Sequence, residues 1–167
     1  GNTWAESTKG LVALDVRTMA ISPNGTVFAG AVNGTWRSTN LGSSWERVFR
    51  SGTTGVAVDS SGRVYTSVHG GGLNRSIDNG STWQRINNGL PVFAPNFVDY
   101  FAFNSKGHIY IGTFVGLFRS VDDAASWEKL KSEGIEGLEI SSSGEIFVAY
   151  RTAQRETVIE RSPDDGD

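Results

Sequence analysis

Short runs of apolar and β-branched residues alternate with turn residues along the whole chain, and no stretch keeps a helical period. In the first part of the chain this pattern predicts strands at 17–22, 26–32, 35–39 and 45–48. Turn-forming residues such as Pro23-Asn24-Gly25 and Asn33-Gly34 separate these runs. The pattern therefore predicts an all-β chain made of four-stranded antiparallel meanders.

The pattern occurs four times. Each copy carries an apolar segment that ends at a glycine, and these glycines are Gly25, Gly62, Gly107 and Gly144. The predicted repeat units cover 8–48, 49–86, 87–130 and 131–162, with an insertion in the third unit. Because a sheet of about 40 residues buries little surface alone, radial packing of such sheets is expected, as in a β-propeller. The chain is interpreted as a single domain, 1–167.

An eight-residue phrase of the form S-x-D-x-G-x-T-W recurs among the units. It is clearest at 76–83, is looser at 38–45 and 120–127, and begins again at Ser162. Ser and Asp side chains can bind the amides of a tight turn, Gly supplies a positive φ, and Trp packs beneath. A scaffold role is therefore predicted for Ser38, Asn40, Gly42, Trp45, Ser76, Asp78, Gly80, Trp83, Ser120, Asp122, Trp127, Ser162, Asp164 and Gly166. Asn40 and Ala124 depart from the phrase and predict looser hairpins.

The phrase resembles the Asp-box, or BNR repeat, of sialidases, xyloglucanases, sortilin-type proteins and photosystem II assembly factor-type proteins. The resemblance spans the chain and implies a β-propeller whose repeated hairpins lie away from the functional face. An arginine precedes each phrase, but one arginine per unit cannot converge on one ligand as the sialidase arginines do, so local pairing is expected. The Arg-Ile-Pro phrase of sialidases is absent.

The two ends of the chain complement each other. Residues 1–7 read as an orphan outer strand, and the last unit lacks an outer strand. Three interpretations stay open: a four-bladed ring closed by its own termini, two chains that form an eight-bladed ring, or part of a longer propeller.

The composition of the chain limits the classes of partner that it can be expected to bind. The net charge is -3, the sequence pI is about 5.4, and no Lys/Arg run stands out, which argues against nucleic acid. No apolar run reaches the roughly 18 residues of a membrane span. The absence of cysteine excludes thiolate metal sites and cysteine nucleophiles, and neither a metal nor a cofactor is expected. The resembled families favour a secreted or periplasmic location.

The positions that do not repeat are the candidates for binding. The insertion 87–97 carries Phe93 and Phe97, which either cap the core or form a ligand surface. His69 lies in the glycine-rich connection 68–72. Arg17, Thr54, Asp99 and Glu136 are equivalent positions at the starts of the inner strands, either as a structural ion-pair ring or as polar ligand contacts. Glu139 stands where the other units have alanine, and its carboxylate is expected to face a water-filled channel, to bind a cationic partner or to hold a proton more readily than usual.

The favoured function is a non-enzymatic module that binds a protein or glycan through its loop face. The ligand contacts predicted for it are Arg17, His69, Phe93, Phe97, Asp99 and Glu136. The alternative is part of a glycoside hydrolase, closer to xyloglucanases than to sialidases, with Asp99 and Glu136 or Glu139 as its acid and base. A homodimer and a longer propeller chain are both open as assemblies.

Overall fold

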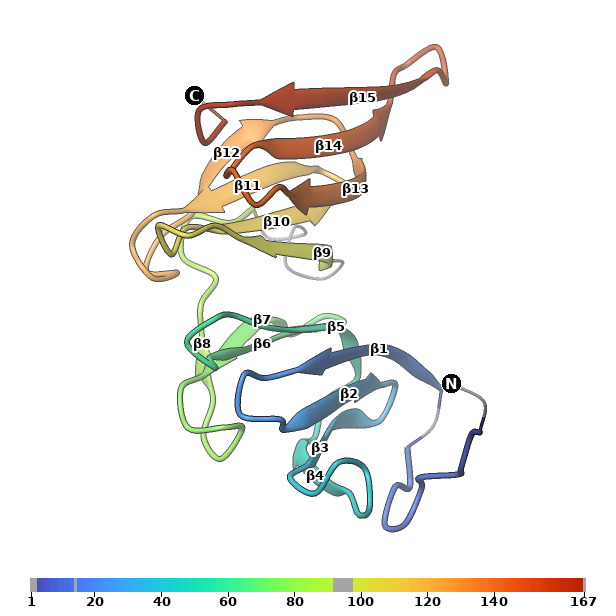
Figure 1. The fold of residues 1–167 in the computed structure, drawn as a ribbon. Coiled ribbons are helices and arrows are strands. Elements are labelled where there is room, and N and C mark those ends of the chain that lie inside the picture. Colours follow the sequence, from blue (N-terminus) through green and yellow to red (C-terminus); the bar gives the residue numbers. More distant parts are fainter. Residues whose placement is uncertain (1–2, 14, 92–97, 167) are drawn as a thin grey trace. The chain divides into compact units, whose positions relative to one another are not determined.

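The computed structural model describes residues 3–13, 15–91 and 98–166, and over these residues the chain is all-β with no helix. Figure 1 shows the strands arranged as separate antiparallel sheets. The chain divides into two compact units, Gly1–His69 with Asn74–Gln84 and Gly70–Leu73 with Arg85–Asp167. The interpretation of 1–167 as a single domain stays a prediction.

The first sheet has the strand order β1-β2-β3-β4. Its strands are β1 (Val16–Ile21), β2 (Val27–Ala31), β3 (Gly34–Ser38) and β4 (Glu46–Phe49). Each lies within a residue or so of its predicted range. The first turn forms as its residue types suggest: the Asn24 side-chain oxygen accepts the Thr26 amide at 3.0 Å, and Gly25 has φ 83°.

The other sheets repeat this meander. The second has the order β5 (Thr53–Val58), β6 (Val64–Val68), β7 (Gly72–Ser76) and β8 (Gln84–Arg85). The third has β9 (Val98–Phe103), β10 (Ile109–Thr113), β11 (Gly116–Ser120) and β12 (Glu128–Lys131) in sequential order. The last has three strands, β13 (Ile135–Ile140), β14 (Ile146–Arg151) and β15 (Thr157–Ser162). The prediction that the last unit lacks an outer strand is confirmed for the residues that the structure describes.

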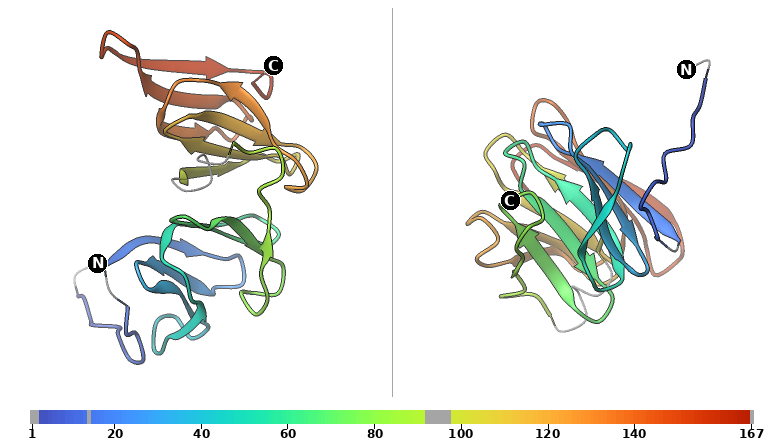
Figure 2. Two further views of the ribbon diagram at one scale, coloured as in Figure 1. Left: turned by 180° about the vertical axis from the view of Figure 1, so that it is seen from behind. Right: turned by 90° about the horizontal axis from the view of Figure 1, so that it is seen from below.

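The predicted orphan outer strand is wrong for its described part. Residues 3–8 form no strand, and the ribbon has no arrow there in Figure 1 or Figure 2. A strand needs a ladder of backbone bonds to a neighbour. This segment instead makes isolated bonds, one of them from Trp45 Nε1 to the Ser7 carbonyl oxygen at 2.9 Å.

Apolar contacts join consecutive sheets within each unit. In the first unit, Phe28 packs with Val56 and Val64, and Ala20 lies against this cluster. In the second unit, Ala102 shares a cluster with Leu138. In these two inner strands, the small residue therefore faces the following sheet.

Glu139 stands in the last sheet at the position that Ala20 and Ala102 occupy in theirs. These two alanines pack against clusters that include residues of the following sheet. Glu139 lies in β13 opposite Phe147 and is exposed. Among the described residues, no further sheet covers it.

Two glycines permit this close approach. A Cβ on Gly30 would lie 2.7 Å from Thr53 Cγ2, and a Cβ on Gly112 would lie 2.7 Å from Ile135 Cγ2. Since real Cβ atoms do not come this close, only glycine fits at these two positions in the second strands.

Candidate functional site

The repeated phrase folds into the same turn in all four copies, and in the first three this turn leads into an outer strand. The buried Ser76 side-chain oxygen accepts the Gly80 amide at 2.8 Å and donates to Asp78 at 2.7 Å. The equivalent serine accepts the equivalent amide at 2.8, 2.9 and 2.8 Å in the copies that begin at Ser38, Ser120 and Ser162. The phrase is therefore a structural hairpin, as its residue types predict.

The acidic residue of the phrase closes the turn. Asp78 accepts the Thr82 amide at 2.8 Å and the Thr82 hydroxyl at 2.6 Å. These bonds from Thr82, with a further one from Ser76, lower the pKa of Asp78 to about 2. Bonds from Ser126 lower the pKa of Asp122 to about 2 in the same way. A carboxylate held this firmly by its own turn is a scaffold group and not a proton carrier.

Two of the hairpins are also tied to the backbone at the end of the preceding outer strand. Trp83 Nε1 donates to the Val48 carbonyl at 3.2 Å, and Trp127 Nε1 donates to the Ile86 carbonyl at 2.8 Å. Val48 is the extra residue of a bulge in β4, where Thr35 pairs with Phe49 and Trp36 with Arg47. The bulge takes its carbonyl out of the regular ladder and makes it available to the indole.

The arginine before each phrase pairs locally, as expected. Arg37 binds Glu46 at 2.6 Å and donates to the carbonyl of Asn79 in the following hairpin. Arg119 binds Glu128 at 2.6 Å and donates to the carbonyl of Asp165 at 2.7 Å. These arginines fasten one sheet to the next.

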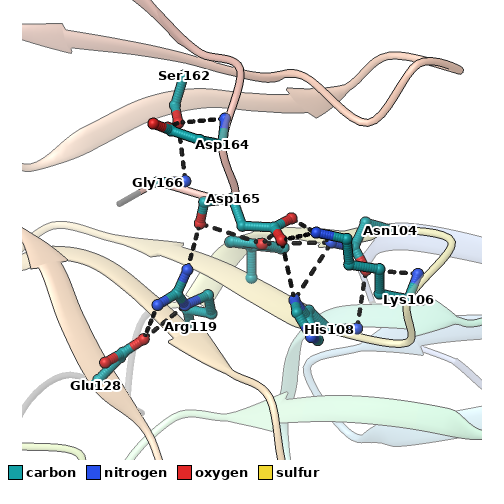
Figure 3. A network of polar contacts seen from close by, with 10 residues as sticks. Asn104, Lys106, His108, Arg119, Glu128, Ser162, Asp164, Asp165 and Gly166 are labelled. Carbon is teal, nitrogen blue, oxygen red and sulfur yellow. Dashed lines mark hydrogen bonds and ion pairs between the residues drawn. The ribbon is translucent and has the colours of Figure 1, made fainter.

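A network of polar contacts surrounds Asp165 in the second unit (Figure 3). The Asp165 carboxylate accepts hydrogen bonds from Asn104 at 2.8 Å, from Tyr110 at 3.2 Å and from Lys106. Lys106 is the main reason that the pKa of Asp165 is lowered. Burial, and then the Asp165 charge, raise the pKa of Tyr110 to about 12. The acid stays charged and the phenol neutral, so these two groups hold the turn at 162–166 against β10.

A second repeated feature lies at the start of the inner strands. Each inner strand contains a β-bulge, and the extra residue is one of the four positions that the sequence singles out. In β1, Val16 pairs with Ala31 and Thr18 with Gly30, which leaves Arg17 unmatched. The same irregularity leaves Thr54, Asp99 and Glu136 unmatched in β5, β9 and β13.

The bulge residues have local partners. Arg17 binds Asp15 at 2.9 Å, and both side chains are at least half exposed. Thr54 shares a hydrogen bond of 2.8 Å with Ser67. Glu136 binds Arg151 at 3.1 Å. The first two lie in one compact unit and the last in the other, so each pair is described by itself.

The other predicted ligand contacts are His69, Asp99, Phe93 and Phe97. His69 is exposed after β6, and its amide donates to the Gly52 carbonyl at 3.3 Å. Asp99 belongs to β9, but the position of its side chain is not described. Phe93 and Phe97 lie outside the described residues.

The insertion at 87–97 has a counterpart that the sequence analysis missed. The Trp127 amide donates to the Asn88 carbonyl at 3.1 Å, and the Trp45 amide donates to the Lys9 carbonyl at 2.9 Å. The Leu90 and Leu11 amides also close equivalent turns. The signal was present: a Gly-Leu pair follows Trp4 and Trp83 at the same spacing. The first half of the insertion is therefore part of the repeat.

The described residues contain neither a cluster of three or more acidic or histidine side chains suited to a metal nor a helix long and apolar enough to cross a membrane.

Comparison with known proteins supports a propeller fold. A family model for the strictosidine synthase-like N-terminal family matches residues 55–76, and no curated protein matches the chain. A GH74 xyloglucanase from Xanthomonas campestris is similar at 19% identity, with a TM-score of 0.75 over 89% of this chain and 28% of that one. YCF48 bound to D1 peptide is similar at 12% identity, with a TM-score of 0.62 over 91% of this chain and 52% of that one.

A third similar structure is the extracellular domain of a two-component system from B. thetaiotaomicron. It is 18% identical, with a TM-score of 0.67 over 86% of this chain and 22% of that one. The chain thus spans about a quarter of the xyloglucanase and about half of YCF48. At these identities the likeness concerns the fold alone.

Proposed function

We propose that the chain is a non-enzymatic β-propeller module of the Asp-box type that binds a protein or glycan with the residues at the starts of its inner strands. The observation that supports this proposal is the bulge in every inner strand. The hairpins repeat their side chains, whereas the bulge residue changes from Arg17 to Thr54, Asp99 and Glu136. Bulges commonly re-aim a side chain beside a functional site, and variation on a constant scaffold is typical of recognition.

The charges of the bulge residues suit a polar ligand. In the Arg17–Asp15 pair and in the Glu136–Arg151 pair, both side chains are exposed to solvent. An exposed ion pair contributes about 0–1 kcal/mol, so a ligand group can replace one partner at little cost. Because a similar structure holds a bound peptide, a peptide is the first ligand class to test and a glycan the second. A secreted or periplasmic location stays a prediction.

The test is selection followed by substitution. Peptides selected from a random display library, and oligosaccharides from an array, are measured by calorimetry against the wild type, Arg17→Gln and Glu136→Gln. Loss of one charged contact is expected to weaken binding about tenfold or more. Arg50→Gln, at an exposed residue just after β4, is the matched control. Ligands that bind both bulge variants as tightly as the wild type would remove the inner-strand starts from the proposal.

The hydrolase alternative makes a different prediction. It requires Asp99 to act with Glu136 or Glu139, and Glu136 is paired with Arg151. A hydrolysis screen on xyloglucan and sialosides decides the matter. Turnover by the wild type that disappears in Asp99→Asn would replace the binding proposal with the enzymatic one.

A further inference from the structure

The free edge of β15 has a cavity beside it. Within the described residues no fourth strand pairs with β15, whereas β4, β8 and β12 complete the other sheets (Figure 1). The cavity has a volume of about 140 Å³; Leu130, Ile146 and Val148 contribute its apolar lining, and Glu160 and Arg161 contribute polar groups.

In the first unit, the position equivalent to this cavity is filled by the side chain of Trp83. Trp83 packs against the cluster of Phe28, Val56 and Val64 and donates to the carbonyl of the bulged residue Val48. By register, Val64 corresponds to Ile146. Val48 corresponds to Leu130, which is the extra residue of a bulge in β12. The cavity therefore has the surroundings of an indole site.

Near its N-terminal end, the chain carries a second Thr-Trp sequence whose tryptophan is exposed. Thr3-Trp4 repeats Thr82-Trp83, and Trp4 is 93% exposed. The Val48 carbonyl, three residues after Trp45, accepts a hydrogen bond from the next tryptophan of the repeat, Trp83. In the same way the Ser7 carbonyl, three residues after Trp4, accepts one from Trp45. Residues 4–7 thus stand where the outer strand of a preceding sheet would stand.

The faces beside these two elements are complementary. Met19 is 59% exposed, while its equivalents Val56 and Leu138 are 6% and 5% exposed because a preceding sheet covers them. Beside Met19 lies a cavity of about 430 Å³. Conversely, Phe147 is 36% exposed, while its equivalent Phe28 is fully buried against the following sheet.

We propose that residues 4–7 of a second copy add to the edge of β15, with the Trp4 indole in the cavity beside Leu130. Phe147 then covers the face around Met19 of that copy. Strand addition of this kind gains affinity from the backbone and specificity from a pocket. The third sheet gives the register, because there Arg119 pairs with Glu128 and Phe118 pairs with Lys129. By equivalence, Arg161 of β15 lies opposite Ala5 of the second copy, and Glu160 lies opposite its Glu6.

The register predicts how the charge of residue 6 affects association, and Glu160 enters it as an acid that also binds Lys131 at 2.5 Å. The residues equivalent to Glu6 are the cations Arg47, Arg85 and Lys129. Two acids directly opposite each other are unfavourable, whereas opposite charges attract. Glu6→Lys is therefore expected to strengthen association between copies, and Trp4→Ala to weaken it about 30-fold or more, as for a central aromatic anchor. Both residues are exposed, so neither change should prevent folding.

Cross-linking tests the contact directly, because the chain has no cysteine. An Ala5→Cys variant is mixed with an Arg161→Cys variant under mild oxidation, so that a mixed disulfide can form only between copies. The mixed product is expected to form readily and to disappear on reduction. Val12→Cys, 72% exposed in the same unit, replaces Ala5→Cys in the control and should not cross-link.

Sedimentation of the cysteine-free variants completes the test. Concentration-dependent association that increases in Glu6→Lys and falls in Trp4→Ala supports the proposal. Absence of the mixed disulfide would overturn it, as would a doubly substituted chain that cross-links only within itself. Equal association of wild type and Trp4→Ala would also overturn it.

Discussion

The hairpins and the inner-strand bulges both occur once per sheet, yet they differ in what repeats. In the hairpins, the backbone turn and its serine recur together, and in every copy an amide donates to the serine hydroxyl at 2.8–2.9 Å. At the bulges, only the backbone irregularity recurs, and the residue changes from cation to hydroxyl to acid. A position whose side chain is constant across sheets serves the scaffold, whereas one whose side chain varies on a constant backbone is free to serve a ligand.

The largest expected effect compares one residue of each kind within the second unit. Trp127 is 6% exposed, so Trp127→Ala should lower the free energy of unfolding by about 3–5 kcal/mol through a cavity and a lost indole bond. Glu136→Gln, which removes one partner of an exposed ion pair, should change it by about 0.5 kcal/mol or less. Urea unfolding followed by circular dichroism measures both. Comparable losses in the two variants would mean that the bulge residue also belongs to the scaffold.

The second effect separates two copies of the hairpin. Gly80 has φ 87°, and an added Cβ would lie 3.2 Å from Val48 Cγ2. Gly80→Ala should therefore destabilise the chain by about 1–2 kcal/mol. Ala124 already tolerates φ 62° with its methyl buried, so Ala124→Gly should change stability by less than about 1 kcal/mol. Thermal unfolding of the two variants provides the comparison, and a larger loss in Ala124→Gly would contradict it.

The sequence predicted most where local chemistry decides the conformation. Turn residues such as Asn24 and Gly25 located the strand ends of the first sheet, and the repeated phrase located its hairpin. Alignment of the units also identified Arg17 and Glu136 as equivalent positions. It did not reveal that they are bulges, because a bulge is defined by pairing with a second strand.

Two other features depended on neighbours that the sequence does not name. Ala20 is small because the following sheet packs against it, which is a contact between distant segments. Residues 4–7 begin with the tryptophan of a Thr-Trp sequence like the one before β8 but have no partner strand among the described residues, and without a partner they form no strand. Local pattern therefore predicted the type of each element, whereas pairing decided which elements formed and where the irregularities lie.

The smallest effect concerns pH and again compares two hairpins. Because the pKa of Asp78 in the folded chain is about 2, below its ordinary 3.8, its charged form contributes stability above about pH 4 that is lost as the pH falls toward 2. Asp78→Asn copies the natural Asn40, whose side-chain oxygen accepts the Ser44 amide at 2.8 Å without a charge. The wild type should therefore be more stable than Asp78→Asn near neutral pH, and this difference should shrink between about pH 4 and pH 2. Carboxyl NMR titration checks the pKa itself, with Glu156 as an exposed carboxyl for comparison. If Asp78 titrated near 3.8, the bonds from Thr82 would not hold its charge, and the hairpins with Asp78 and Asn40 would be electrostatically alike.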